Sequence, residues 1–143
     1  MNIDKMTIKL RQAIGDADML ANEHGNAEIS TEHLLLALLA QKEGLLTPLF
    51  QRLGVPASDV VTKLDELVNK LPKVYGSNTQ RSISAQLGNQ LYAADKIAVE
   101  FKDQYLSAEH VLLAIMDDGS NAAKVLKKLG VTKEHVMQAL QTI

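Results

Sequence analysis

Two Glu-His pairs carry the residue types most able to do chemistry. Residues 29–39 read ISTEHLLLALL and residues 106–116 read LSAEHVLLAIM, so each pair follows a Ser and precedes an aliphatic run. A carboxylate beside an imidazole could act as a general acid and base or bind a metal. Adjacent residues on a helix, however, point about 100° apart, which separates the two side chains. We therefore interpret Glu32 and His33 as a helix start, in which Ser30 caps the N-terminus and the helix dipole stabilises the acid.

No other pattern in the chain indicates catalysis. The four His residues, at positions 24, 33, 110 and 135, match neither HExxH nor another zinc-ligand spacing. The chain lacks a G-x-S-x-G nucleophile elbow and a P-loop, so we expect it not to be an enzyme and to bind no ATP or metal itself. Binding to nucleic acid is also disfavoured, because the candidate recognition helices are acidic and phosphates would repel them. These exclusions leave a protein-binding module.

The composition indicates an aliphatic, helical protein. Hydrophobic residues make up 46% of the 143 residues but aromatic ones only 3%, and the net charge is −2. Leu, Ala, Met, Lys, Gln and Glu all enter helices at little cost. The chain has no Cys, no signal-peptide core and no apolar run of about 18 residues, so we expect a cytoplasmic protein that does not enter a membrane.

The twin phrase belongs to a longer internal repeat. A shift of 77 residues also aligns Leu10 with Leu87 and Ala21 with Ala98. After a one-residue slip, RLGV at 52–55 matches KLGV at 128–131. We expect one compact domain over 1–143, with repeat one at about 1–70 and repeat two at about 83–143. The joint at about 71–82, LPKVYGSNTQRS, contains Pro, Gly and polar residues typical of a linker.

Each repeat is predicted to form four helices. Apolar residues three or four apart mark a buried stripe in each first helix, and Ser30 and Ser107 are placed to cap the second helices. The third helix is expected to begin at Thr47, with Pro48 at its first position, and the fourth helices to cover about 57–70 and 133–142. Because a repeat of this size has a thin core, the two should pack around a pseudo-two-fold axis, which gives an all-α fold of eight helices.

The repeated SxEHxLLA phrase and the matching segments RLGV at 52–55 and KLGV at 128–131 together resemble the duplicated Clp N-terminal domain. The joint LPKVYG, after a helix ending in LVNK, is similar to the ClpB branch, the AAA+ protein disaggregases. The resemblance covers essentially the whole chain. In that family the domain precedes two ATPase modules, and this chain stops before either would begin.

The resemblance implies that the domain engages unfolded or aggregated polypeptide and passes it to the ATP-driven pore of a hexamer, while the isolated domain is expected to be monomeric. It also implies substrate-binding roles for a set of residues, namely Thr7, Asp103, Glu109, Leu91, Ala93, Ile97 and His110. Several relatives have Leu at the positions of Ala93 and His110, so an apolar groove here would be less hydrophobic.

The residue pattern supports this set only in part. Leu91 belongs to the buried stripe, which favours a core role, whereas Ala93 and Ile97 fall off that stripe. Asp103 lies in a loop between helices, where functional polar residues are common. The acid is present only in the second repeat, because the counterpart of Asp103 is Asn26.

Two alternatives remain open at this point. One is an adaptor-docking domain, as in the ClpC and ClpA branches, in which a partner protein delivers substrates. The other is a regulatory scaffold domain that binds no substrate.

Overall fold

The computed structural model describes residues 3–74 and 81–142, and part of the predicted joint, 75–80, lies outside them. The described residues form eight α-helices, one 3-10 turn and one pair of two-residue strands, which confirms the all-α prediction. In chain order the elements are the 3-10 turn Ile3–Lys5, α1 (Ile8–Glu23), β1 (Glu28–Ile29), α2 (Thr31–Ala40), α3 (Leu46–Arg52), α4 (Ala57–Asn69), β2 (Ser82–Ile83), α5 (Ala85–Glu100), α6 (Ala108–Met116), α7 (Asn121–Lys128) and α8 (Lys133–Leu140).

The first helices of the two repeats begin at equivalent positions. Both α1 and α5 have 16 residues, and each follows a hydroxyl residue whose oxygen accepts a backbone N–H three residues on: Thr7 for α1 and Ser84 for α5. These caps satisfy one of the N–H groups that a helix start leaves without a partner. The repeat seen in the sequence is therefore a repeat in the structure as well.

Short backbone pairings connect the two repeats. Strands β1 and β2 pair in parallel, with Ile29 opposite Ile83, and an isolated bridge joins Met6 to Leu106. A shift of 77 residues relates Met6 to Ile83 and Ile29 to Leu106, so the two pairings are equivalent. In each, the segment before the first helix of one repeat pairs with the segment before the second helix of the other. The sequence pattern did not predict these pairings.

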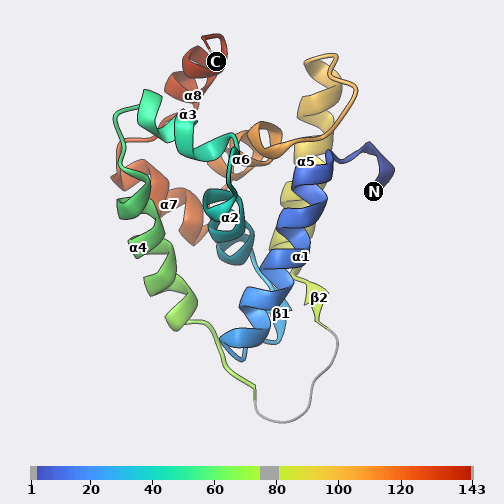
Figure 1. Ribbon diagram of the computed structural model, residues 1–143, viewed down its shortest axis with the longest axis vertical. Coiled ribbons are helices and arrows are strands. Elements are labelled where there is room, and N and C mark those ends of the chain that lie inside the picture. Colours follow the sequence, from blue (N-terminus) through green and yellow to red (C-terminus); the bar gives the residue numbers. More distant parts are fainter. Residues whose placement is uncertain (1–2, 75–80, 143) are drawn as a thin grey trace.

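The central helices α2 and α6 explain the continuous aliphatic runs. Helix α2 is buried from Thr31 to Leu39 and α6 from His110 to Met116, so neither needs a polar face. Helix α1 packs on α2, α5 on α6, α4 on α7 and α3 on α8. Figure 1 shows α1 and α5 along one side and α3, α4, α7 and α8 along the other.

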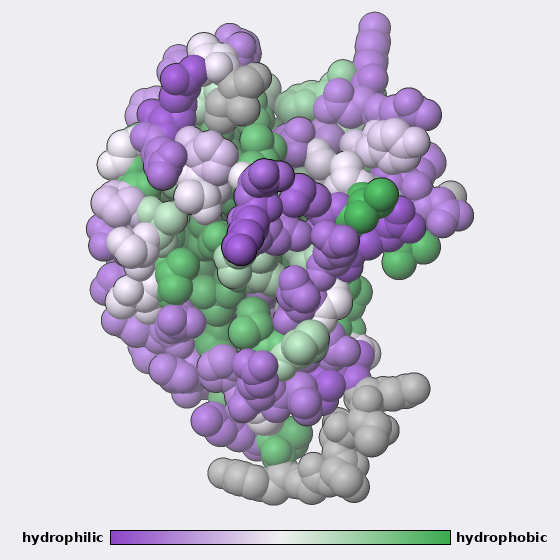
Figure 2. Space-filling model, in the orientation of Figure 1, coloured by the Kyte–Doolittle hydropathy of each residue, from purple (hydrophilic) through white to green (hydrophobic). Residues whose placement is uncertain are grey.

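One apolar cluster of buried residues runs through both repeats. On the face shown in Figure 2, hydrophilic residues cover most of the surface, and hydrophobic ones gather towards the middle. Among the described residues, no helix is long and apolar enough to cross a membrane.

The predicted start of the third helix is wrong, because Pro48 was expected as the first helical residue and the helix begins two residues earlier. Helix α3 begins at Leu46, after Leu45, which makes no side-chain cap. Thr47 does not cap the helix, because its hydroxyl donates to the carbonyl of Leu39 at 3.2 Å. Pro48 is tolerated inside the helix because its missing N–H falls among those that have no intrahelical partner in the first turn.

Candidate functional site

The end of helix α5 positions Asp103. Lys102 adopts the left-handed conformation, with φ of 60°, and the N–H of Asp103 donates to the carbonyl of Ala98 at 2.9 Å. This is the hydrogen-bond pattern of a Schellman helix end. In the first repeat, Gly25 has φ of 68° and Asn26 donates to the carbonyl of Ala21. The helix end therefore directs Asp103 and Asn26 to equivalent places.

His110 connects Asp103 to the start of α6. Its Nδ1 accepts the backbone N–H of Ser107 at 3.0 Å, so the ring proton lies on Nε2, which donates to Oδ2 of Asp103 at 2.7 Å. The ring of His110 also meets that of Phe101 edge-on, with centroids 5.7 Å apart. The His110 side chain is 1% exposed, whereas that of Asp103 is 47% exposed. A buried ring thus holds an accessible carboxylate in one orientation.

Glu109 and Thr7 both lie near the end of this loop that leads into α6. The hydroxyl of Ser107 donates to the carboxylate of Glu109, so Glu109 and His110 bind different partners and form no dyad. The backbone N–H of Thr7 donates to the carbonyl of Leu106 at 2.9 Å, which joins the start of α1 to the same loop. The structure therefore brings Thr7, Asp103 and Glu109 to one region.

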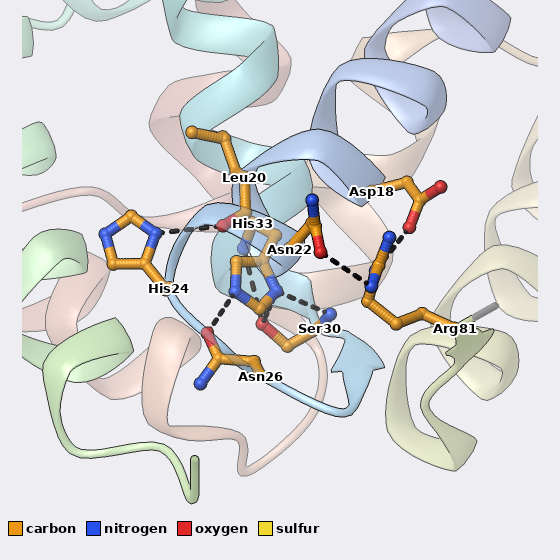
Figure 3. Close-up of polar contacts among 8 residues, drawn as sticks. All are labelled: Asp18, Leu20, Asn22, His24, Asn26, Ser30, His33 and Arg81. Atoms are coloured by element: carbon orange, nitrogen blue, oxygen red, sulfur yellow. Dashed lines mark hydrogen bonds and ion pairs between the residues drawn. The ribbon is translucent and has the colours of Figure 1, made fainter. Parts of the chain in front are cut away.

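The first repeat contains a neutral version of this network, shown in Figure 3. Nδ1 of His33 accepts the backbone N–H of Ser30 at 2.9 Å, and Nε2 lies 2.9 Å from Oδ1 of Asn26. The same view shows Arg81, whose Nε donates to Asp18 at 2.7 Å and thereby ties the chain before β2 to α1. The capping-and-packing role predicted for His33 is confirmed, since the ring itself closes the cap of α2.

Burial shifts the pKa of both residues in the first Glu-His pair. Burial raises the pKa of Glu32 above its usual value, and a hydrogen bond from its own backbone N–H offsets this in part. Burial, helped by the nearby His24, lowers the pKa of His33 to about 4. Both shifts favour the neutral forms.

The remaining residues of the predicted groove are less accessible. Leu91 is 3% exposed and lies in the core, as its position on the buried stripe of the helix predicted. His110 is 1% exposed. Ala93 and Ile97 are half-buried and pack against the core. Direct contact of a ligand with Leu91 or His110 would require the structure to open.

A neighbouring hollow was not predicted. It has a volume of about 340 Å³ and lies between the end of α5 and α8, lined by Phe101, Asp103, Met137, Leu140 and Gln141. Met137 and Leu140 are three residues apart on α8 and so share a face, which is the sequence signal that could have indicated it. Within 3–74 and 81–142, no cluster of three or more Asp, Glu, His or Cys residues is arranged to hold a metal ion.

Comparison with known proteins identifies the family. The model of the Clp repeat (R) N-terminal domain matches residues 5–129. The chain belongs to this Clp N-terminal domain family. Over its whole length it is 32% identical to a chaperone protein ClpB of Clostridium perfringens, of which it spans 17%. The chain is therefore similar to a small part of a much longer chaperone.

Solved structures show the same Clp N-terminal fold. The Hsp104 N-terminal domain of Candida albicans has a TM-score of 0.83 and 24% identity, with 96% of this chain and 91% of that one covered. A ClpV N-domain in complex with a VipB peptide has a TM-score of 0.75 and 17% identity, with 96% and 86% covered. At these identities the likeness supports the fold alone.

Proposed function

We propose that this Clp N-terminal domain binds unfolded or aggregated polypeptide as the substrate-engaging part of a ClpB-type disaggregase. The single observation that supports this most is the accessible carboxylate of Asp103, held by buried His110 at the rim of an apolar hollow. An exposed acid fixed in this way costs side-chain freedom without contributing much stability. A ligand that uses the carboxylate would explain the arrangement.

The ligand expected at this site is an extended chain with apolar and basic side chains. An apolar side chain would occupy the hollow between Phe101, Met137 and Leu140. Asp103 and Glu109 would accept hydrogen bonds from basic side chains or backbone N–H groups, and Thr7 would contribute its hydroxyl. Few directional contacts give broad specificity, which suits a domain that must accept many unfolded proteins.

Binding at one such site should be weak. The contact is small, so the ordering of the ligand offsets most of the free energy of burial, and we expect dissociation constants of about micromolar or poorer. Copies in a hexamer would raise the effective affinity through avidity. The chain spans only a small share of ClpB. Other parts of a longer cytoplasmic protein would therefore transfer the polypeptide to an ATP-driven pore.

Three charge-removing variants test the proposal. Asp103→Asn keeps the hydrogen bond to His110, because Asn26 makes the same bond to His33 in the first repeat. Glu109→Gln removes the second charge, and Asp65→Asn on α4 is the control because Asp65 is exposed and outside the site. Fluorescence anisotropy with a labelled, permanently unfolded polypeptide should show weaker binding for the first two variants and unchanged binding for the control. Equal binding by all three would overturn the assignment.

The rival function is docking of a folded adaptor. Its support is that one structural relative, a ClpV N-domain, binds a VipB peptide. A pull-down that compares a denatured protein with a folded adaptor separates the two, because substrate engagement requires the denatured protein and adaptor docking requires the adaptor. Binding to neither would favour the scaffold alternative.

A further inference from the structure

A basic groove lies between helices α4 and α7. It has a volume of about 220 Å³, and its lining includes three exposed lysines and three half-buried apolar residues: Lys63, Lys70, Lys128, Leu67, Val125 and Leu129. The groove shares no residue with the hollow beside Asp103. It therefore offers a positively charged rim around an apolar floor, at a place that the proposed polypeptide site does not use.

Two of the three lysines have no partner. Nζ of Lys63 lies 3.7 Å from Oε2 of Glu66, an exposed pair that contributes little to stability. Among the described residues, no ion pair involves Lys70 or Lys128. Lys128 lies in the last turn of α7 and Lys70 directly follows α4, where the helix dipole favours a cation. The dipole explains why these charges are tolerated, and both remain free to bind an external carboxylate.

Helix α1 presents an acidic face of complementary character. Asp16, Met19, Leu20 and Glu23 all line one hollow against α2, so they share a face of the helix. Both acids are exposed, and within residues 3–74 and 81–142 neither takes part in an ion pair. Met19, which lies between them, is 62% exposed. An exposed Met between two unpaired acids is a surface that a second protein can cover.

The charges of the acidic face and the basic groove match in spacing. Asp16 and Glu23 on α1 are seven residues apart, as are Lys63 on α4 and Lys70 at its end. Seven residues span about 10 Å along a helix. Two such helices laid side by side therefore bring both acids next to lysines, and Met19 then lies over the apolar floor of the groove.

We propose that copies of this chain associate head to tail, with the acidic face of α1 on one copy seated in the basic groove of the next. Figure 1 places α1 on one side of the molecule and α4 and α7 on the other, so the two surfaces meet between copies. Because the contact joins two different surfaces, it extends into a ring or a row of copies. The inference does not depend on polypeptide binding near Asp103.

This contact should be weak between separate chains. Its small area leads us to expect a dissociation constant of about millimolar, so the chain is monomeric in dilute solution. Copies tethered in a larger assembly would meet at a high effective concentration, which makes a weak contact effective.

Self-association of the whole chain tests the contact. In NMR spectra recorded from about 0.05 to about 2 mM, the amide signals of residues 16–23, 63–70 and 125–129 should shift together as the concentration rises. Added salt should reverse these shifts, because it screens exposed charges. No unfolded polypeptide is present, so a negative result leaves the proposed function untouched. An absence of concentration-dependent shifts, or shifts on one of the two surfaces alone, overturns the head-to-tail contact.

Charge reversal assigns the contact to these residues. Asp16→Lys with Glu23→Lys, and separately Lys63→Glu with Lys70→Glu, should each weaken self-association about tenfold or more, because each places like charges opposite one another. An equimolar mixture of the two variants should restore association, since each reversed face then meets a reversed groove. A mixture that fails to associate overturns the pairing of these two surfaces.

Two further variants separate the contributions of charge and apolar contact. Glu100→Lys with Glu134→Lys changes the net charge as much as the Asp16 and Glu23 variant does, at exposed positions outside both surfaces, and should self-associate like the natural chain. Met19→Ser removes an exposed side chain and should weaken self-association about fivefold without changing the fold. Circular dichroism first checks the helix content of every variant. Unchanged association of Met19→Ser, or loss of association in the Glu100 and Glu134 variant, overturns the assignment. Shifts of the groove caused by an unfolded polypeptide but not by concentration assign the groove to that ligand instead.

Discussion

His33 should make the stability of this Clp N-terminal domain depend on pH. Its ring is 0% exposed, and both nitrogens are engaged, one by the backbone N–H of Ser30 and the other by the side chain of Asn26. Protonation of Nδ1 would place an N–H against the N–H of Ser30. Burial, with a smaller contribution from His24, therefore lowers the pKa to about 4 from the ordinary 6.5.

The size and sign of the effect follow from linkage. Below pH 6.5 the unfolded chain takes up a proton at His33, whereas the folded chain does so only near pH 4. The free energy of unfolding therefore has its full value above pH 6.5 and decreases as the pH falls through this window. At about 1.4 kcal/mol for each pH unit of pKa shift, the loss is about 2 kcal/mol between pH 7 and pH 5 and about 3 kcal/mol by pH 4. This is a large share of the 5–15 kcal/mol typical of a domain.

Urea unfolding of the natural chain and of His33→Gln at pH 7, 6 and 5 measures this contribution. Gln at the third helical position can accept the N–H of Ser30 and keep the cap, but it does not titrate. The natural chain should lose about 2 kcal/mol more than the variant between pH 7 and pH 5. Asn26→Asp places a carboxylate beside His33 and should reduce that loss, because the negative charge stabilises the protonated ring. Equal losses in the natural chain and His33→Gln would refute the reasoning.

Other substitutions test separate parts of the structure. Glu32→Gln should raise the free energy of unfolding at pH 7 in urea titrations, because burial raises the pKa of the acid and disfavours its charged form. This gain in stability should shrink as the pH falls towards 4.5, and a gain that stays constant with pH would contradict burial of the charge as its cause. Lys102→Gly should stabilise the chain by about 0.5–1 kcal/mol, because Lys102 has φ of 60°. Gly25→Ala should destabilise the equivalent helix end by about 1 kcal/mol, and thermal unfolding of both variants would show whether the signs differ.

Helix starts in this chain were predictable where local chemistry decides them. Ser30 and Ser107 precede α2 and α6 as expected. Because α5 repeats the sequence pattern of α1, the prediction of one helix also predicted the other. Thr47 misled the prediction because its hydroxyl bonds to a carbonyl of α2, a contact that depends on how the helices pack. The two-residue strands are too short for any periodic signal and form only when the repeats meet.

The candidate site was predictable as a set of positions but not as a geometry. The sequence indicated that Asp103 lies in a loop and that Leu91 belongs to the core stripe, and the structure agrees with both. It did not indicate that His110 would turn inward and hold Asp103, because that bond joins residues seven apart across a helix end. The hollow against α8 also depends on tertiary packing.

Mapping of an unfolded polypeptide on the chain by NMR is the most direct test of the central proposal. Titration with a permanently unfolded protein should shift the amide signals of Thr7, residues 101–110 and the Met137–Leu140 face of α8. Asp103→Asn should weaken those shifts while the rest of the spectrum stays unchanged. An absence of shifts, or shifts that cluster on α3 and α4 instead, would contradict the assignment of this region to substrate binding.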